Sequence, residues 1–165
     1  MKPALLIVDM QKACFKVNPN AVQSLNEAAE YINATVTLFR EKALPVICIH
    51  HVSEEMDLVP GKEDFGVPDE LAVLPSDLHI HKKYGNAFNR TSLAEELGKL
   101  GVDTVIVTGY CAEYCVLSTY RAAQDNDLTA IMLRGALASD SRENIRFVES
   151  ISELITFRAL RKMLE

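Results

Sequence analysis

A cysteine stands just beyond the end of a β-branched segment, in the run Thr104-Val-Ile-Val-Thr-Gly-Tyr-Cys-Ala-Glu-Tyr-Cys115. The first five residues of this run are all β-branched, which predicts a strand that is buried on both faces. Gly109 ends the strand, and residues that favour a helix begin at about Glu113. A thiol at a helix N-terminus lies near the positive end of the helix dipole, which lowers its pKa. Cys115 is therefore the first candidate for a nucleophile.

Two charged residues end other apolar segments. Asp9 follows the apolar run that begins at Pro3, where a carboxylate is costly unless it has a partner or a function. Burial raises the pKa of such a group, so that it can accept a proton near neutrality. Lys82 ends another short predicted strand, and its ammonium group would favour both a carboxylate and a thiolate. A cysteine with a base and a cation beside it is an activated nucleophile for acyl transfer, and backbone N–H groups of the turn before it can stabilise an oxyanion.

Each of these residues also has an ordinary structural interpretation. A cysteine near a helix start is commonly a small buried apolar residue. Asp9 can cap the loop that follows it, and Lys82 beside Lys83 can be one of two solvated lysines. The functional interpretation depends on their joint position at strand ends, because ligands of open α/β sheets bind in the crevice beyond the carboxyl ends of the strands.

The elements that must position these residues alternate along the chain. We predict strands at 3–9, 45–49, 78–81, 104–108, 129–133 and 154–157. Predicted helices begin at the Asn18-Pro19 cap and at the capping box Ser92–Glu95, and three more cover 113–124, 142–150 and the C-terminal residues to Leu164. The segment Val52–Pro75 has little periodicity and is predicted to be a long functional loop.

This alternation predicts an α/β fold of one domain over residues 1–165, a three-layer α/β/α Rossmann-like arrangement with a parallel sheet of about six strands. Right-handed crossovers place the carboxyl ends of the strands at one edge of the sheet. Asp9, His50, Lys82 and the turn Gly109–Cys115 are expected to meet there.

Composition limits the class of protein. The 165 residues are 48% hydrophobic and carry a net charge of −6 without a basic block, which argues against a nucleic-acid partner. The apolar run Ala4–Val8 is too short for a signal peptide or a membrane span, so no membrane partner is expected. Four cysteines in a chain without an export signal favour a reduced, cytoplasmic setting over a disulfide framework.

Three blocks of the sequence carry a specific resemblance. They are Leu6-Ile-Val-Asp9-Met-Gln11 with Phe15, then His81-Lys82-Lys83-Tyr-Gly-Asn-Ala-Phe88-Asn-Arg-Thr91, and Val107-Thr-Gly-Tyr-Cys-Ala-Glu-Tyr-Cys115-Val. In order and spacing they resemble the isochorismatase-like cysteine hydrolases, a superfamily that includes nicotinamidases and N-carbamoylsarcosine-type amidohydrolases. The resemblance covers nearly the whole chain.

The resemblance implies a mechanism and a set of catalytic residues. Asp9 is the base that takes the thiol proton, and Cys115 attacks a carbonyl or carboxamide carbon to form a thioester that water hydrolyses. The family's lysine lies six residues before the phenylalanine, which selects Lys82 and not Lys83. The expected partner is a small amide, ureido or carbamoyl substrate, and the expected assembly is a homo-oligomer.

The resemblance also implies the surroundings of the nucleophile. The family has a cis non-proline peptide bond ahead of it, which corresponds to Tyr110–Cys111 and would aim the N–H groups of Cys111 and Cys115 at the oxyanion. Aromatic residues near the three blocks are candidates for the substrate pocket, together with residues of the 52–75 loop. These aromatic residues are Phe15, Tyr84, Phe88 and Tyr110.

Two departures from the family narrow the reaction. Nicotinamidases carry a metal-binding Asp-x-His after the second strand, whereas this chain has His50-His51. Adjacent strand residues point to opposite faces and chelate poorly, so we expect no metal and no other cofactor. True isochorismatases lack the nucleophilic cysteine, so the presence of Cys115 argues against that reaction.

Two functions from other classes stay open. A catalytically silent family member could serve as a binding or scaffold protein. A thiol redox protein could use Cys111 and Cys115, which are four residues apart, although no further Cys/His cluster completes a zinc site with them. A flavodoxin-type nucleotide binder is disfavoured because Thr108–Tyr114 contains one glycine and no phosphate-binding loop.

Overall fold

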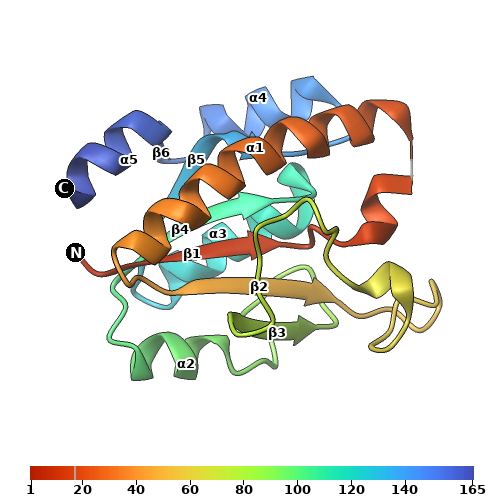
Figure 1. Ribbon diagram of the computed structural model, residues 1–165, viewed down its shortest axis with the longest axis horizontal. Helices are drawn as coiled ribbons and strands as arrows, with labels where there is room; N and C mark the ends of the chain where they lie inside the picture. The colour runs from red at the N-terminus through yellow and green to blue at the C-terminus, as the bar shows by residue number, and fades with distance from the viewer. Residues whose placement is uncertain (17) are drawn as a thin grey trace.

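The computed structural model describes residues 1–16 and 18–165 and contains a six-stranded sheet in the order β3-β2-β1-β4-β5-β6 (Figure 1). The strands are β1 (Pro3–Val8), β2 (Val46–His51), β3 (Leu78–Lys82), β4 (Thr104–Gly109), β5 (Thr129–Leu137) and β6 (Leu154–Ile155). Neighbouring strands are parallel throughout. The α/β fold with six parallel strands is thus confirmed. The main differences are that β2 includes both histidines, β5 is longer than predicted and β6 is shorter.

Helices follow the strands on both sides of the sheet. They are α1 (Pro19–Glu41), α2 (Leu93–Lys99), α3 (Leu117–Asp125), α4 (Arg142–Ser150) and α5 (Phe157–Leu164), with short helical turns η1 (Lys12–Lys16), η2 (Glu63–Phe65) and η3 (Ala112–Val116). The predicted cap of α1 is present, because Asn18 Oδ1 accepts a hydrogen bond from Ala21 N at 2.8 Å. The predicted capping box of α2 is wrong: the Ser92 side chain makes no capping hydrogen bond, and Leu93 N instead donates to Thr91 Oγ1.

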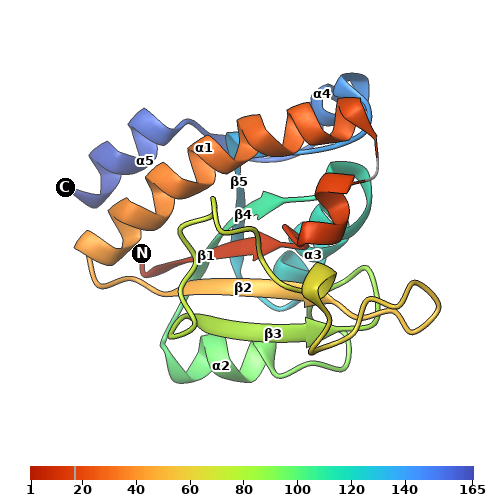
Figure 2. The same ribbon diagram turned by 45° about the vertical axis from the view of Figure 1, so that its right-hand side comes forward.

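Two apolar layers cover the sheet. The layer containing α1 and α5 packs on one face, and the layer containing α2, α3 and α4 packs on the other. Figure 2 shows α1 and α2 on opposite sides of the strands. In β1, Leu5 and Ile7 belong to the first layer, while Leu6 and Val8 belong to the second. This alternation explains why β1 is apolar at every position and why its first polar residue, Asp9, comes at its end.

The helix predicted from Glu113 begins differently from expectation. The π-helical turn η3 comes first, and Val116 N donates to Cys111 O at 3.2 Å across five residues. This wider turn carries Cys115 as its fourth residue, ahead of α3.

The segment between β2 and β3 folds back over the sheet. It contains a short bridge between Ser53 and Leu58 and the turn η2, and then crosses β1 and β2 on the α1 side before β3 begins (Figure 1). Arg40 and Asn33 on α1 hold it through hydrogen bonds to the backbone of Ala72. No helix among the described residues is long and apolar enough to cross a membrane.

Candidate active site

The carboxyl ends of three strands supply the charged and nucleophilic groups. Asp9 follows β1, Lys82 is the last residue of β3, and the turn after β4 leads to Cys115. That turn lies tightly against β1. Gly109 has φ of 114°, and a Cβ atom there would lie 2.1 Å from the carbonyl oxygen of Val8. A glycine is needed at this position because it alone permits both the backbone conformation and the close approach.

The ammonium group of Lys82 lies at the centre of the site. Its Nζ atom is 2.9 Å from Asp9 Oδ2, 3.0 Å from the carbonyl oxygen of Tyr84 and 3.3 Å from Cys115 Sγ. Lys82 is 1% exposed, and Asp9 is 4% exposed. A buried charge requires partners of this kind, because its desolvation would otherwise cost several kcal/mol. The structure therefore brings together the three residues predicted to carry the chemistry.

Burial affects the protonation of Asp9 and Cys115, the candidate base and the candidate nucleophile. It raises the pKa of Asp9, and the nearby charge of Lys82 offsets part of that rise. Burial also raises the pKa of Cys115 to about 12, helped by the negative charge of Asp9 and opposed by Lys82. The expectation that a helix N-terminus lowers the pKa of Cys115 is wrong, because this thiol is buried beside a carboxylate. The raised pKa favours the thiol form of Cys115, and the carboxyl group of Asp9 lies beside it.

A pocket of about 260 Å³ opens beside these residues. Its lining combines Asp9 and Cys115 with apolar, aromatic and acidic side chains, which come from η1, η3, the 52–75 loop and the segments that follow β1, β4 and β5. The lining residues are Asp9, Gln11, Cys14, His51, Met56, Leu58, Tyr110, Cys111, Glu113, Tyr114, Cys115 and Asp140. The peptide bond Tyr110–Cys111, at the wall of this pocket, is cis as expected. The volume suits a small molecule, below the usual range of drug-sized sites.

The comparison with known families agrees with this geometry. Residues 3–149 match the isochorismatase domain. The chain belongs to the isochorismatase family. It is 30% identical over 140 residues to the uncharacterised isochorismatase family protein YrdC of Bacillus subtilis, a match that spans 84% of this chain and 74% of that protein.

Solved structures of hydrolases have the same fold. An isochorismatase-like hydrolase from Alkaliphilus metalliredigens superposes with a TM-score of 0.88 over the full length of both chains, at 21% identity. An N-carbamoylsarcosine amidase from Thermoplasma acidophilum gives a TM-score of 0.79 at 23% identity, over 94% of this chain and 95% of that one. At these identities the likeness shows the fold alone.

The side chains of the two adjacent histidines lie on opposite faces of β2. His51 Nδ1 lies 3.1 Å from Lys82 Nζ, and burial together with the charge of Lys82 lowers the pKa of His51. The neutral ring therefore accepts at Nδ1 and carries its proton on Nε2. His50, which was expected at this edge, points to the other face of β2 and meets His79 instead. Alternation along a strand that reaches residue 51 is the signal that identifies His51 as the pocket residue.

Three aromatic residues predicted for the pocket are not among its described lining. Phe15 packs against the α1 layer, and Phe88 packs against the opposite layer. Tyr84 is 41% exposed and reaches the site only through its carbonyl oxygen, while its ring lies by Arg90. Phe15 and Phe88 pack against the core while Tyr84 faces solvent, so closeness to a motif in sequence does not by itself place a side chain in the pocket. Tyr110 does line the pocket.

Hydrogen bonds fix two further pocket residues. Gln11 donates to the carbonyl oxygens of His51 and Phe65 and accepts from His51 N at 2.8 Å, so it joins the end of β2 to η2. Glu113 accepts from the thiol of Cys111 at 3.0 Å and from Ser139. Burial disfavours charge on Glu113, yet these hydrogen bonds outweigh it and lower its pKa, so the residue is a carboxylate at neutral pH.

Proposed function

We propose that this isochorismatase-family member is a metal-independent cysteine hydrolase that cleaves a small amide, ureido or carbamoyl compound through a thioester on Cys115. One observation carries the proposal: a single buried ammonium group, on Lys82, contacts both the base candidate Asp9 and the sulfur of Cys115 beside a pocket. A nucleophile with an adjacent base and an orienting group is the arrangement of covalent acyl transfer.

The proposed reaction begins with transfer of the Cys115 thiol proton to Asp9. Oδ1 of Asp9 has no hydrogen-bond partner among the described residues, so it is free to accept that proton. The sulfur attacks the carbonyl carbon, and the N–H groups of Cys111 and Cys115 are the proposed donors to the oxyanion. The C–N bond then breaks, and Asp9 returns its proton to the departing nitrogen, which leaves as ammonia or an amine.

Hydrolysis of the thioester completes the cycle. Asp9 takes a proton from water, and the hydroxide attacks the acyl carbon. The C–S bond breaks, the carboxylic or carbamic acid leaves, and the proton returns to the sulfur of Cys115. The charge of Lys82 stays in place throughout and stabilises the thiolate whenever it forms. A raised pKa for the thiol fits this scheme, because the proton is moved within the site when substrate is bound.

The acidic groups in the pocket favour a substrate that is rich in N–H donors. Glu113 and Asp140 both line it, and Asp140 already accepts from the hydroxyl of Tyr110 at 2.7 Å. Carboxylates accept hydrogen bonds and cannot donate them when ionised. Ureido and carbamoyl compounds supply such donors, and the fold shared with an N-carbamoylsarcosine amidase is consistent with this class.

The test is an ammonia-release screen over small amides, ureides and carbamoyl compounds with the purified protein. Asp9→Asn keeps the shape but removes the base, and Lys82→Ala removes the charge, so each should lower kcat by about 100-fold or more. Lys83 is exposed and pairs with Glu54, so Lys83→Ala is the matched control and should stay near wild type. A larger loss in Lys83→Ala than in Lys82→Ala would contradict the assignment.

The same preparation separates the other classes of function. Iodoacetamide should modify Cys115 before the buried Cys48, and intact-mass analysis with substrate should show an acyl adduct on Cys115. A scaffold protein would release no ammonia and form no adduct. A redox protein would form a reversible Cys111–Cys115 disulfide under mild oxidant without turnover.

A further inference from the structure

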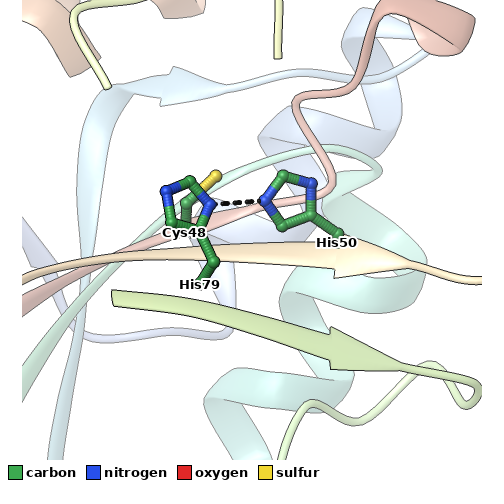
Figure 3. A group of neighbouring side chains, drawn as sticks. All are labelled: Cys48, His50 and His79. Carbon is green, nitrogen blue, oxygen red and sulfur yellow. Dashed lines mark hydrogen bonds between the residues drawn. The ribbon is translucent and has the colours of Figure 1, made fainter. Parts of the chain in front are cut away.

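Three potential metal ligands gather on the face of the sheet that does not carry the catalytic lysine. Cys48 and His50 are two residues apart on β2, and His79 on β3 pairs in register with Cys48. Their side chains therefore share one face, on which Figure 3 shows the two imidazole rings and the thiol close together. The ligating atoms all lie within 4.8 Å of one another. His51 and Lys82 project from the opposite face.

The two imidazole rings are oriented toward a common point. His50 Nε2 and His79 Nδ1 are 2.9 Å apart, and His79 Nε2 lies 3.0 Å from the carbonyl oxygen of Leu74. A carbonyl oxygen only accepts, so His79 carries its proton on Nε2 and directs the lone pair of Nδ1 at His50. This is the way in which a backbone carbonyl orients a histidine that binds a metal.

One ring nitrogen of His50 has no hydrogen-bond partner among the described residues. To bond His79, His50 must hold its proton on Nε2, which leaves Nδ1 as a buried acceptor without a partner among the described residues. The backbone of Phe65 lies near the His50 ring and favours its protonated form, which opposes the lowering of the His50 pKa by burial. With its proton on Nδ1, His50 would present a second lone pair at the same point as His79.

We propose that Cys48, His50 and His79 bind a borderline transition-metal ion of the Zn²⁺ type, at a site separate from the catalytic pocket. One thiolate and two imidazoles are ligands that Zn²⁺ takes in proteins. Tetrahedral zinc with Zn–N bonds of 2.0–2.1 Å places two ligand nitrogens about 3.3 Å apart, so the rings need to separate by only about 0.4 Å. Binding releases the proton of Cys48, and the remaining position belongs to water or an anion.

The surroundings suit an ion held for structural reasons. Cys48 is 1% exposed and His50 is 4% exposed, while His79 is only partly buried and leaves a way in. The site would join β2 to the edge strand β3 and, through Leu74, to the end of the long loop. The inference stands apart from the proposed hydrolase activity, because none of the three ligands lines the catalytic pocket as described. It also concerns a different place from the strand-end position at which nicotinamidases bind metal.

The experiment titrates the metal-free protein with Co²⁺, whose thiolate charge-transfer absorption reports a Co–S bond, and then displaces it with Zn²⁺. A second group, Asp9, His51 and Cys115, also has metal-ligand chemistry, so the Cys115→Ser variant serves as the background. In this background we expect one equivalent of Co²⁺ with the absorption. Adding Cys48→Ser should abolish the absorption, and adding His79→Gln should weaken binding by at least about 10-fold.

His81→Gln is the matched control, because the ring of His81 lies 5.5 Å from that of His50 but is not among the three ligands. It should leave the affinity within about 3-fold of the background, given ordinary effects of nearby surface changes. Circular dichroism of each metal-free variant checks folding, and the half-buried His79 makes His79→Gln the variant of choice if Cys48→Ser does not fold.

Two outcomes would overturn the proposal. If the single variant Cys48→Ser keeps the absorption and the single variant Cys115→Ser loses it, the ion lies in the catalytic pocket. Failure of the wild type to bind one equivalent at micromolar Co²⁺ or Zn²⁺ would also overturn it.

Discussion

The carboxyl group of Asp9 decides in which pH range the proposed chemistry can run. Asp9 is almost fully buried, and its only charged neighbour at hydrogen-bond distance among the described residues is Lys82. Burial stabilises the neutral acid, whereas Lys82 stabilises the carboxylate, and the net effect raises the pKa of Asp9. A base must be unprotonated to accept the thiol proton. Acidification therefore removes the base earlier than it would for an exposed aspartate.

We expect kcat/KM to fall on acidification with a midpoint above 3.8, the ordinary pKa of aspartate. The sign follows from the raised pKa: the folded enzyme binds this proton at a higher pH than a free carboxyl group does. The measurement is a kcat/KM profile on the substrate found in the ammonia screen, since that ratio reports groups of the free enzyme. Circular dichroism at each pH shows whether the protein is still folded where kcat/KM falls. The control variant Lys83→Ala should give the same midpoint. A midpoint at or below 3.8 would contradict the role of Asp9.

At the scale of single residues, the sequence predicted the site residues that lie at a strand end or helix start and within a motif. Asp9, Lys82 and Cys115 were found in this way, and the structure brings them into contact. It did not predict the protonation of Cys115, because the helix-dipole argument omits burial and the neighbouring carboxylate. It missed His51 because the predicted strand ended two residues too early, at Ile49.

At the scale of elements, the turn between β4 and η3 determines where Cys115 lies. The end of β4 pairs with the end of β1, with Gly109 opposite Val8, and Tyr110 N then donates to Val8 O at 2.9 Å. The chain can pass so close to β1 only because Gly109 has no side chain. Sequence patterns marked this glycine as a strand end. They could not show the contact with Val8, which is 101 positions away and exists only in the folded sheet.

Gly109→Ala should lower the free energy of unfolding by more than about 3 kcal/mol, because the new methyl group meets backbone atoms that no rotamer change can move. Gly61→Ala is the control: Gly61 also has positive φ, at 91°, but has nothing within 4 Å of the added Cβ. It should cost only about 1–2 kcal/mol. Urea unfolding measures both, through a shifted midpoint at constant slope. Equal losses in the two variants would show that backbone conformation alone, and not the approach to Val8, sets the requirement.

Across the whole molecule, one sheet separates two groups of reactive side chains. Lys82 and His51 meet Cys115 on one side of β2 and β3, whereas Cys48, His50 and His79 meet on the side covered by α1 and the long loop. The alternation of side chains was foreseeable from the sequence, and so was the parallel sheet. The second group was not, because it needs the register between β2 and β3, which no local pattern specifies.

This separation predicts that a chelator will change stability without changing turnover. An ion held at 100 times its dissociation constant stabilises the folded state by about 2.7 kcal/mol, which for a chain of this length corresponds to about 5–10 °C in Tm. Removal of the ion should lower Tm by that amount, and added Zn²⁺ should restore it. Ammonia release should stay within about 2-fold of the untreated enzyme, because the proposed steps use none of the three proposed metal ligands.

The control for this experiment is Cys48→Ser, whose Tm should no longer respond to the chelator while its turnover persists. Differential scanning fluorimetry and the ammonia assay on the same samples give both quantities. Loss of turnover with chelator would show that an ion acts in the catalytic pocket, against the metal-independent mechanism. A Tm that does not change with chelator would instead contradict the proposed metal site at Cys48, and the metal-independent mechanism would still stand. The two proposals can therefore fail separately, as expected if the sheet keeps their sites apart.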